Sequence, residues 1–223
     1  MPSPNVQRDG FIDRHSLVSE YDEFLIEGAS NFRRISQTSV HAVAQPTIDG
    51  LKNVLRKLRR DRGRGESILW INLREEPIIY INGIPYVLRD RYFTLRNIRA
   101  YSGITSSRLE MLEQRLKEDV INETINYEGR ILLHGEDKDG NVRAVWEDVH
   151  VDDILTVKDV MEQVAAEVSN DSDAESVPED EKAIQLAYYR VPVTAEKPPE
   201  WKDFDDMRNL IASTDHPDAN IVL

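Results

Sequence analysis

The chain of 223 residues contains no cysteine. Disulfide bonds, thiolate metal sites and cysteine nucleophiles are therefore excluded within it. It also lacks an apolar run of the ~20 residues needed to span a bilayer, which predicts a protein that is not inserted in a membrane. The segment Met1–Arg8 has neither a basic start followed by an apolar stretch nor a cleavage-site pattern, so we expect a cytoplasmic protein.

Positive charge is scarce in the chain as a whole, but it is unevenly distributed. The formal net charge of −13 argues against a nucleic-acid partner, because such proteins usually present a basic surface. Residues 1–108 hold 17 Lys and Arg against 12 Asp and Glu, whereas residues 109–223 hold 11 against 29. The N-terminal half is therefore where an anionic ligand is expected.

The N-terminal half combines an arm with a pattern typical of an α/β sheet. Residues 1–30 show no sustained periodicity and are interpreted as an arm with a short helix near residues 21–26. Pro46-Thr47 offers a helix start, and the apolar run at residues 67–73 predicts a strand buried on both faces. Asn82-Gly83 between two apolar runs predicts a tight hairpin, because both residues tolerate positive φ angles.

The C-terminal half alternates predicted helices and strands. Ser107 and Glu110 form a capping-box pattern for a helix reaching about residue 123, and Thr156 opens a second helix. The remaining predictions are strands at 129–134, 141–149, 184–191 and 220–223, and a helix at 204–212. Residues 167–181 hold seven acids and no base, which predicts a flexible loop.

Several patterns that imitate ligand sites have simpler explanations. The five histidines have no metal-ligand spacing, so no metal and no cofactor is expected. Asp137–Asn141 imitates the start of a calcium-binding loop, but Val142 stands where that loop needs glycine, so a hairpin turn is favoured. Arg62–Gly65 follows a helix and precedes a strand, the reverse of the order in phosphate-binding loops, and is interpreted as a helix stop.

Arg74 ends the predicted buried strand and is a candidate for anion binding. In open α/β sheets, residues at the carboxyl ends of parallel strands reach the ligand crevice, and arginine is suited to bidentate phosphate contacts. An ion pair between Arg74 and the neighbouring Glu75 or Glu76 is an equally weighted alternative. The spacing alone leaves both interpretations open.

Four segments together resemble the repeat unit of paladin-like proteins, which belong with the protein-tyrosine-phosphatase-like inositol phosphatases, or cysteine phytases. They are Asn31-Phe32-Arg33-Arg34, Ala44-Gln45-Pro46-Thr47, Trp70–Pro77 and Tyr80–Arg89. The resemblance runs from about residue 31 to the C-terminus. It implies an α/β fold with a protein-tyrosine-phosphatase-like central mixed sheet flanked by helices, truncated near the C-terminal end of the core. On this basis, residues 31–223 form an incomplete domain, with residues 105–168 as an insert or peripheral layer.

The resemblance also implies a reaction centre and a set of binding residues. In the family, a cysteine thiolate in a loop of backbone amides attacks phosphorus, and an arginine stabilises the phosphoryl group. That loop is expected after Leu223, where this chain ends. Phytase-like members carry an aspartate as general acid at the point where this sequence has Ala195 followed by Glu196. Glu196 is therefore the candidate for the general acid, and Asp203 and Asp205 are the alternatives. The substrate-binding candidates are Arg33, Arg34, Gln45 and Arg74.

Three hypotheses about function follow from the sequence. The chain is the front part of a cysteine-dependent phosphatase-like domain, inactive alone; or a non-catalytic module that binds inositol polyphosphates or phosphoproteins; or an interaction domain without a ligand. The expected partners are a phosphorylated small molecule or phosphoprotein and a tandem copy of the same domain in a longer protein. If residues 220–223 form a central strand, the isolated chain should be marginally stable and prone to aggregate.

Overall fold

The computed structural model describes residues 6–8, 21–23, 25–62, 67–88, 103–136, 141–169, 185–194, 198–213 and 219–223. The chain divides into two compact units. We call residues 12–73, 161–191 and 198–223 the parallel unit, and residues 1–11, 74–160 and 192–197 the hairpin unit. In the described ranges, no helix combines the length and the hydropathy needed to cross a membrane.

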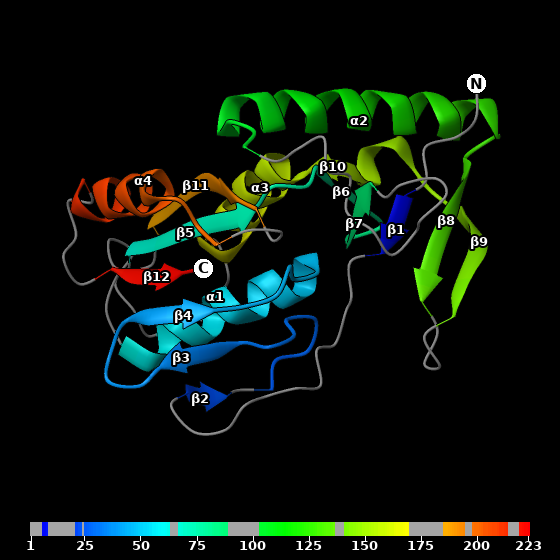
Figure 1. Ribbon diagram of the computed structural model, residues 1–223. Coiled ribbons are helices and arrows are strands. Elements are labelled where there is room, and N and C mark those ends of the chain that lie inside the picture. Colours follow the sequence, from blue (N-terminus) through cyan, green and yellow to red (C-terminus); the bar gives the residue numbers. More distant parts are fainter. Residues whose placement is uncertain are drawn as a thin grey trace. The chain divides into compact units, whose positions relative to one another are not determined.

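The parallel unit is built around a six-stranded sheet with the order β11-β5-β12-β4-β3-β2 (Figure 1). Its strands are β2 (Tyr21–Glu23), β3 (Arg33–Ile35), β4 (Val40–Ala42), β5 (Ser67–Arg74), β11 (Gln185–Val193) and β12 (Asn220–Val222). β12 runs parallel to both of its neighbours, β4 and β5, whereas β3 is antiparallel to β4 and to β2. The sheet is therefore mixed, with a parallel centre.

β12 is short, but backbone hydrogen bonds join it to β4 along its whole length. Ile221 donates its N–H to the Ser39 carbonyl at 2.9 Å, and Leu223 donates to the His41 carbonyl at 3.0 Å. The Leu223 carbonyl in turn accepts from the Val43 N–H at 3.0 Å. Val222 is fully buried, which confirms the prediction that the last residues form a buried strand.

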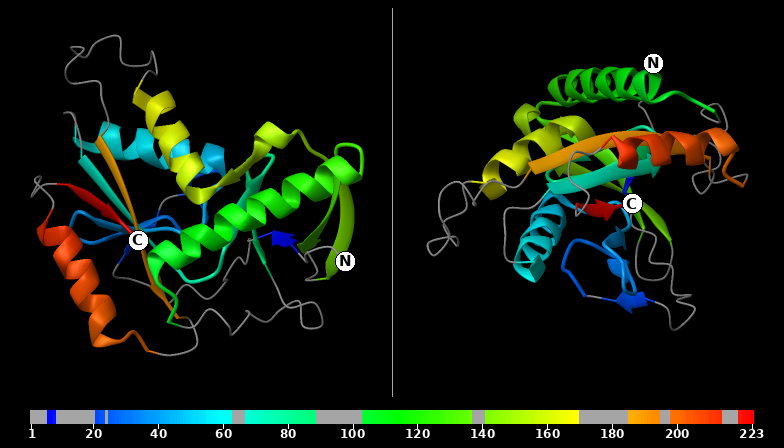
Figure 2. Two further views of the ribbon diagram at one scale, coloured as in Figure 1. Left: turned by 90° about the horizontal axis from the view of Figure 1, so that it is seen from above. Right: turned by 90° about the vertical axis from the view of Figure 1, so that its left-hand side faces the viewer.

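Helices cover both faces of this sheet. They are α1 (Ile48–Arg62), residues 161–169 of α3 (Val157–Ser169), and α4 (Trp201–Ala212). The two views of Figure 2 place α1 and α3 on one face and α4 on the other. Lys52 of α1 pairs with Glu167 of α3. Hydrogen bonds from Lys52 and then Gln163 hold the pKa of Glu167 below its ordinary value.

A close backbone approach fixes the start of α1. Thr47 donates its N–H to the Gly28 carbonyl at 2.9 Å, and its hydroxyl accepts the Gly50 N–H at 3.0 Å, as expected of a helix cap. A Cβ atom on Gly50 would lie 2.0 Å from the Gly28 carbonyl oxygen, and Gly28 itself has a φ of +77°. Both glycines are therefore required, although glycine inside a helix normally costs stability.

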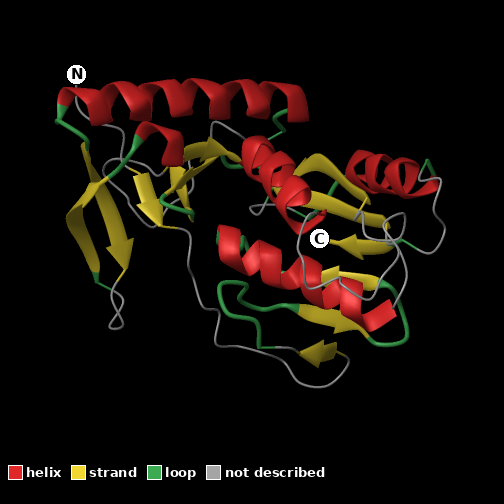
Figure 3. Cartoon of the chain, turned by 180° about the vertical axis from the view of Figure 1, so that it is seen from behind, coloured by secondary structure: helices red, strands yellow, loops and turns green. Residues whose placement is uncertain are grey.

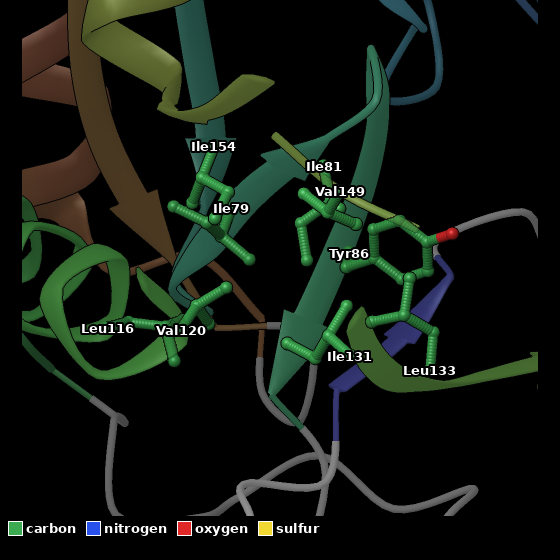
Figure 4. Close-up of a cluster of buried hydrophobic side chains, with 9 residues drawn as sticks. All are labelled: Ile79, Ile81, Tyr86, Leu116, Val120, Ile131, Leu133, Val149 and Ile154. Atoms are coloured by element: carbon green, nitrogen blue, oxygen red, sulfur yellow. The ribbon is translucent and has the colours of Figure 1, made fainter. Parts of the chain in front are cut away.

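The hairpin unit has its own six-stranded sheet, with the order β10-β6-β7-β1-β8-β9. Its strands are β1 (Val6–Arg8), β6 (Ile78–Ile81), β7 (Ile84–Leu88), β8 (Arg130–Glu136), β9 (Val142–Asp148) and β10 (Ile154–Thr156). The long helix α2 (Ser106–Asn126) and the short 3-10 helix η2 (Val151–Asp153) complete the unit (Figure 3). Ile79 and Ile81 of β6, Leu116 and Val120 of α2 and Ile131 of β8 gather in its apolar core (Figure 4).

Most predicted elements are present, and two local predictions are wrong. The Asn82-Gly83 hairpin is confirmed, with φ angles of 50° and 77° at the turn. The short helix expected at residues 21–26 is wrong, because Tyr21–Glu23 pair with β3 as a strand. The start of α2 is also wrong by two residues: Thr105, rather than Ser107, is the N-cap and accepts the Arg108 N–H.

Some expectations concern residues that the structure does not describe. These are residues 63–66 after the first helix, the turn at 137–140, residues 170–181 of the acidic segment at 167–181, and Glu196. The proposed division into an arm at 1–30 and a domain at 31–223, with a layer at 105–168, stays a prediction.

Glu113 provides a test of the hairpin unit. Its side chain is 1% exposed, and its Oε1 accepts the Ile78 N–H at 2.9 Å. In a Glu113→Leu variant this buried N–H loses its acceptor, so we expect a loss of ~1–3 kcal/mol in the free energy of unfolding. Glu113→Gln keeps a carbonyl acceptor and should lose much less. Urea titration measures both, with the exposed Glu118→Leu as control; equal losses for all three variants would contradict this role.

Asp159 lies in the first turn of α3, where its side chain contacts both Thr156 at the start of that helix and Lys117 of α2. Its Oδ2 accepts from Lys117 Nζ at 2.8 Å and from the Thr156 N–H at 2.9 Å, and the Thr156 hydroxyl accepts the Asp159 N–H at 3.2 Å. This reciprocal pattern is a capping box. Burial alone would raise the pKa of Asp159, but the hydrogen bonds from Lys117 and Thr156 outweigh it and hold the pKa below the ordinary 3.8.

The lowered pKa of Asp159 predicts a pH-dependent contribution to stability. A carboxylate with a depressed folded-state pKa stabilises the fold above its unfolded-state pKa, and this contribution disappears as the pH falls through the folded-state value. Asp159→Asn should therefore lose roughly 0.5–1 kcal/mol at neutral pH, because solvent screens a side chain that is 35% exposed. The difference from the unchanged chain should shrink below the ordinary pKa of 3.8. Denaturant melts across this range test it; a pH-independent difference would refute it.

Candidate anion-binding edge

The carboxyl ends of β4, β12 and β5 meet at one edge of the sheet in the parallel unit, because these three strands are parallel. Loops that follow such ends are the usual place for ligand sites in open α/β sheets. Here the edge is formed by the residues after Ala42, by Leu223, and by Asn72 and Leu73 near the end of β5. We call it the carboxyl edge.

One row of side chains crosses four strands next to this edge. The strand register places Trp70 beside Val222, Val222 beside His41, and His41 opposite Arg34. Residues that are in register on neighbouring strands project from the same face of a sheet, and side chains alternate along each strand. Asn72, two residues beyond Trp70, therefore shares this face with Arg34 and His41.

Neighbouring side chains hold the polar members of this row. The rings of Phe32 and His41 stack with their centroids 5.5 Å apart and an interplanar angle of 6°. Both residues are buried, so His41 is fixed by packing as well as by its strand. Asn72 is also buried, and its Nδ2 donates to Gln45 Oε1 at 3.2 Å. This bond ties the loop after β4 to the end of β5.

Arg33 and Arg34 do not lie on the same face. They are successive residues of β3, and successive side chains of a strand point to opposite faces of its sheet. Arg34 shares the face of His41, whereas Arg33 is opposite Ala42 and donates from Nη1 to the Asn31 carbonyl at 3.0 Å. Of the two arginines, Arg34 is the one that shares a face with the Gln45–Asn72 pair.

Arg74 is the last residue of β5, and the compact units divide between Leu73 and Arg74. Its Nε lies 3.5 Å from Glu76 Oε2, so the predicted local ion pair exists, with Glu76 as the partner. The Glu76 side chain is 6% exposed and that of Arg74 is 31% exposed. Glu75 is buried too, and its Oε2 has no hydrogen-bond partner among the described residues.

The two described candidates for a general acid have local structural roles. Asp203 Oδ2 accepts the Glu200 N–H at 2.8 Å in the capping box of α4. Asp205 pairs with Arg208 at 3.0 Å on the same helix. Neither contact points to proton transfer, and Glu196 lies outside the described residues.

Other kinds of site find little support in this part of the chain. Across the described ranges, no group of three or more His, Asp or Glu side chains could hold a metal ion. A cavity of about 260 Å³ opens at the other end of the strands, lined by Ser67, Gln185 and Ala219 together with Ile68, Leu69, Leu186 and Ala187. Its lining contains no charged side chain, so it does not suit a polyanion.

Sequence reasoning missed the roles of His41 and Asn72. Asn72 lies in one of the segments that carry the family resemblance, and His41 lies three residues before another, but the sequence assigns a contact to neither. The signal for Asn72 was present, because an amide within the apolar run at 67–73 must be hydrogen-bonded if the strand is buried. The stacking of His41 on Phe32 depends on the pairing of β3 with β4, which no local pattern indicates.

Comparison with curated proteins finds vertebrate paladins. A stretch of 92 residues is 35% identical to paladin of Gallus gallus, and one of 107 residues is 30% identical to paladin of Homo sapiens. These stretches cover 41% and 47% of this chain, but only 10% of each paladin. The chain therefore matches a small part of those longer proteins.

Comparison with solved structures finds phytases of the same fold. The tandemly repeated protein-tyrosine-phosphatase-like phytase of Mitsuokella multacida superposes with a TM-score of 0.60 at 14% identity, covering 100% of this chain and 35% of that one. The same comparison values hold for the M. multacida enzyme in complex with myo-inositol-(1,3,4,5)-tetrakisphosphate. The phytase of Bdellovibrio bacteriovorus has a TM-score of 0.54 at 16% identity, covering 95% of this chain and 64% of that one. These likenesses confirm the predicted fold class.

The family comparison covers most of the chain. Residues 71–223 match the protein-tyrosine-phosphatase-like phytase family, whose description reads "Inositol hexakisphosphate". The match includes the end of β5, all of the described hairpin unit after β1, and both α4 and β12. This chain belongs to the protein-tyrosine-phosphatase-like phytase family.

Proposed function

We propose that this chain is the front part of a cysteine-dependent phosphatase-like domain, and that its carboxyl edge contributes to binding an inositol polyphosphate. The observation that carries the proposal is the parallel arrangement of β4, β12 and β5, which brings Gln45, Asn72 and Leu223 to one edge of the sheet. A relative of the same fold is known in complex with myo-inositol-(1,3,4,5)-tetrakisphosphate. The charge of the N-terminal half suits such an anion.

In this proposal each polar side chain has a distinct part. Arg34 supplies positive charge on the face that carries His41 and Asn72, and a guanidinium can form two parallel hydrogen bonds to one phosphate. The Asn72–Gln45 bond positions the loop that follows β4. Arg74 begins the hairpin unit and is a separate candidate, whose guanidinium lies in an ion pair with Glu76 of the same unit. Arg33, on the other face of β3, makes the smaller contribution.

Hydrolysis by the 223-residue chain is not expected. The family reaction forms a bond between a cysteine sulfur and phosphorus while the bond from phosphorus to the leaving oxygen breaks, and it requires a thiolate. The sequence holds no cysteine. A second candidate function, a non-catalytic module that binds phosphorylated ligands in the cytoplasm, is favoured by the same observation. The two candidates differ in whether the gene encodes a cysteine loop after Leu223.

The first experiment measures phosphate release from inositol hexakisphosphate. The 223-residue chain should release no phosphate above the buffer background, because it lacks the nucleophile. Extending the chain with the residues that its gene encodes beyond Leu223 should restore turnover if they include a cysteine and an arginine in a glycine-rich loop. Turnover by the cysteine-free chain itself would refute the proposed mechanism. A gene that stops after Leu223 would leave the non-catalytic module as the function.

The second experiment measures binding of the same ligand by calorimetry. Arg34→Ala and Arg74→Ala should each weaken binding about tenfold, because each removes a charge-assisted hydrogen bond. Arg33→Ala should weaken it less than Arg34→Ala, and Gln45→Ala should weaken it by loosening the loop after β4. Arg108→Ala, an exposed arginine at the start of α2, is the matched control. No heat of binding, or an equal loss for the control, would contradict the assigned site.

A further inference from the structure

Helix α4 carries two stripes of side chains, and one of them faces solvent. Asp203, Asp206, Met207 and Leu210 are half-buried, whereas Trp201, Phe204, Arg208 and Ile211 are exposed. Each set recurs at intervals of three and four residues, the spacing of one helix face. The helix lies over one face of the sheet in the parallel unit (Figure 2). The exposed set, which we call the outer stripe, is the one that faces solvent.

The outer stripe is more apolar than a solvated helix face requires. Trp201 is 87% exposed, Phe204 51% and Ile211 42%. Single exposed apolar residues are ordinary, but here three large ones lie on one side of a twelve-residue helix. The Trp201 and Phe204 rings already lie with their centroids 6.3 Å apart at an angle of 55°. Such a pre-formed aromatic pair loses little conformational entropy when a partner covers it.

The outer stripe is also symmetric in sequence. Trp201 and Ile211 lie five residues on either side of Asp206, and Phe204 and Arg208 lie two residues on either side. If a second α4 packs antiparallel across a two-fold axis near Asp206, Trp201 meets Ile211 of the second copy. Phe204 then meets Arg208 of the second copy. This is the pairing of a and d positions in antiparallel heptad packing, and a self-complementary surface is what a two-fold dimer requires.

We propose that the outer stripe of α4 is a homodimer interface, occupied by α4 of a second copy of this chain in antiparallel orientation. The charge pattern supports this occupant, because each Arg208 guanidinium is placed over the Phe204 ring of the other copy, in a cation–π contact made twice. Arg208 now pairs with Asp205 on the same helix, with side chains 76% and 59% exposed. An ion pair that exposed contributes little, so Arg208 can turn to the other copy.

The interface is small and the dimer is correspondingly weak. One helix face buries less area than the ~1,200 Å² of a standard stable interface. Each copy also carries a net charge of −13, which opposes association at low salt. Dimerisation of separate chains is therefore expected at high protein concentration and moderate salt. Two copies within one polypeptide would associate more readily, because a linker raises their effective concentration.

Disulfide crosslinking tests the pairing, and the absence of native cysteine makes each introduced thiol unambiguous. A mixture of the Trp201→Cys and Ile211→Cys chains should form a crosslinked dimer under mild oxidation, because the two positions face each other. Trp201→Cys alone should not, because in antiparallel packing the two copies of this position are separated by ten residues, about 15 Å along the helix. Adding Phe204→Asp to both chains should abolish the crosslink. Crosslinking of Trp201→Cys alone with the efficiency of the mixture would overturn the antiparallel arrangement.

Sedimentation velocity of the unmodified chain gives an independent measurement. The mean mass should rise toward the dimer as protein concentration increases, and Phe204→Asp should raise the dissociation constant about 30-fold, as expected of a central aromatic contact. Met111→Asp, the same kind of change at a 58% exposed site on α2, should leave it unchanged. Far-UV circular dichroism checks that both variants stay folded. A chain that remains monomeric at millimolar concentration, or an equal effect of the two variants, would overturn the proposal.

Discussion

The backbone hydrogen bonds of β12 are the constraint on which the parallel unit depends. This strand has three residues, yet it lies between β4 and β5 and connects the two halves of their sheet. Its register with Trp70 on one side and His41 on the other sets which residues share a row. The positions of Arg34 and Asn72 on one face follow from that register. Without β12, β4 and β5 would each have an edge with unpaired amide and carbonyl groups.

The same arrangement explains why polar groups are tolerated at a buried sheet edge. Asn72 and Gln45 satisfy each other by a hydrogen bond, and His41 is packed flat against Phe32. Arg74 has a carboxylate from Glu76 close to its guanidinium. Buried polar groups cost free energy unless they are paired, so the Asn72–Gln45 bond keeps an amide next to the apolar core without a large penalty.

Local patterns in the sequence predicted the elements whose signals are local. The Asn82-Gly83 hairpin, the buried strand β5 and the helix after Thr47 all follow from turn chemistry and periodicity. The pairing of Tyr21–Glu23 with β3 could not be predicted in this way, because it is stabilised by a strand partner and not by its own sequence. The opposite faces of Arg33 and Arg34 required the knowledge that both lie within β3. The sequence places the N-cap of α2 two residues too late, at Ser107 instead of Thr105, because threonine and serine both cap helices well.

The position of β12 has a consequence for how the chain is made. Residues 220–223 follow the end of β5 by about 150 residues of chain, but they complete the middle of the sheet rather than its edge. At 5–20 residues per second, β5 is synthesised roughly 8–30 seconds before the strand that lies beside it. The pairing of β12 with β4 joins residues about 180 positions apart in the sequence, and such distant contacts form slowly.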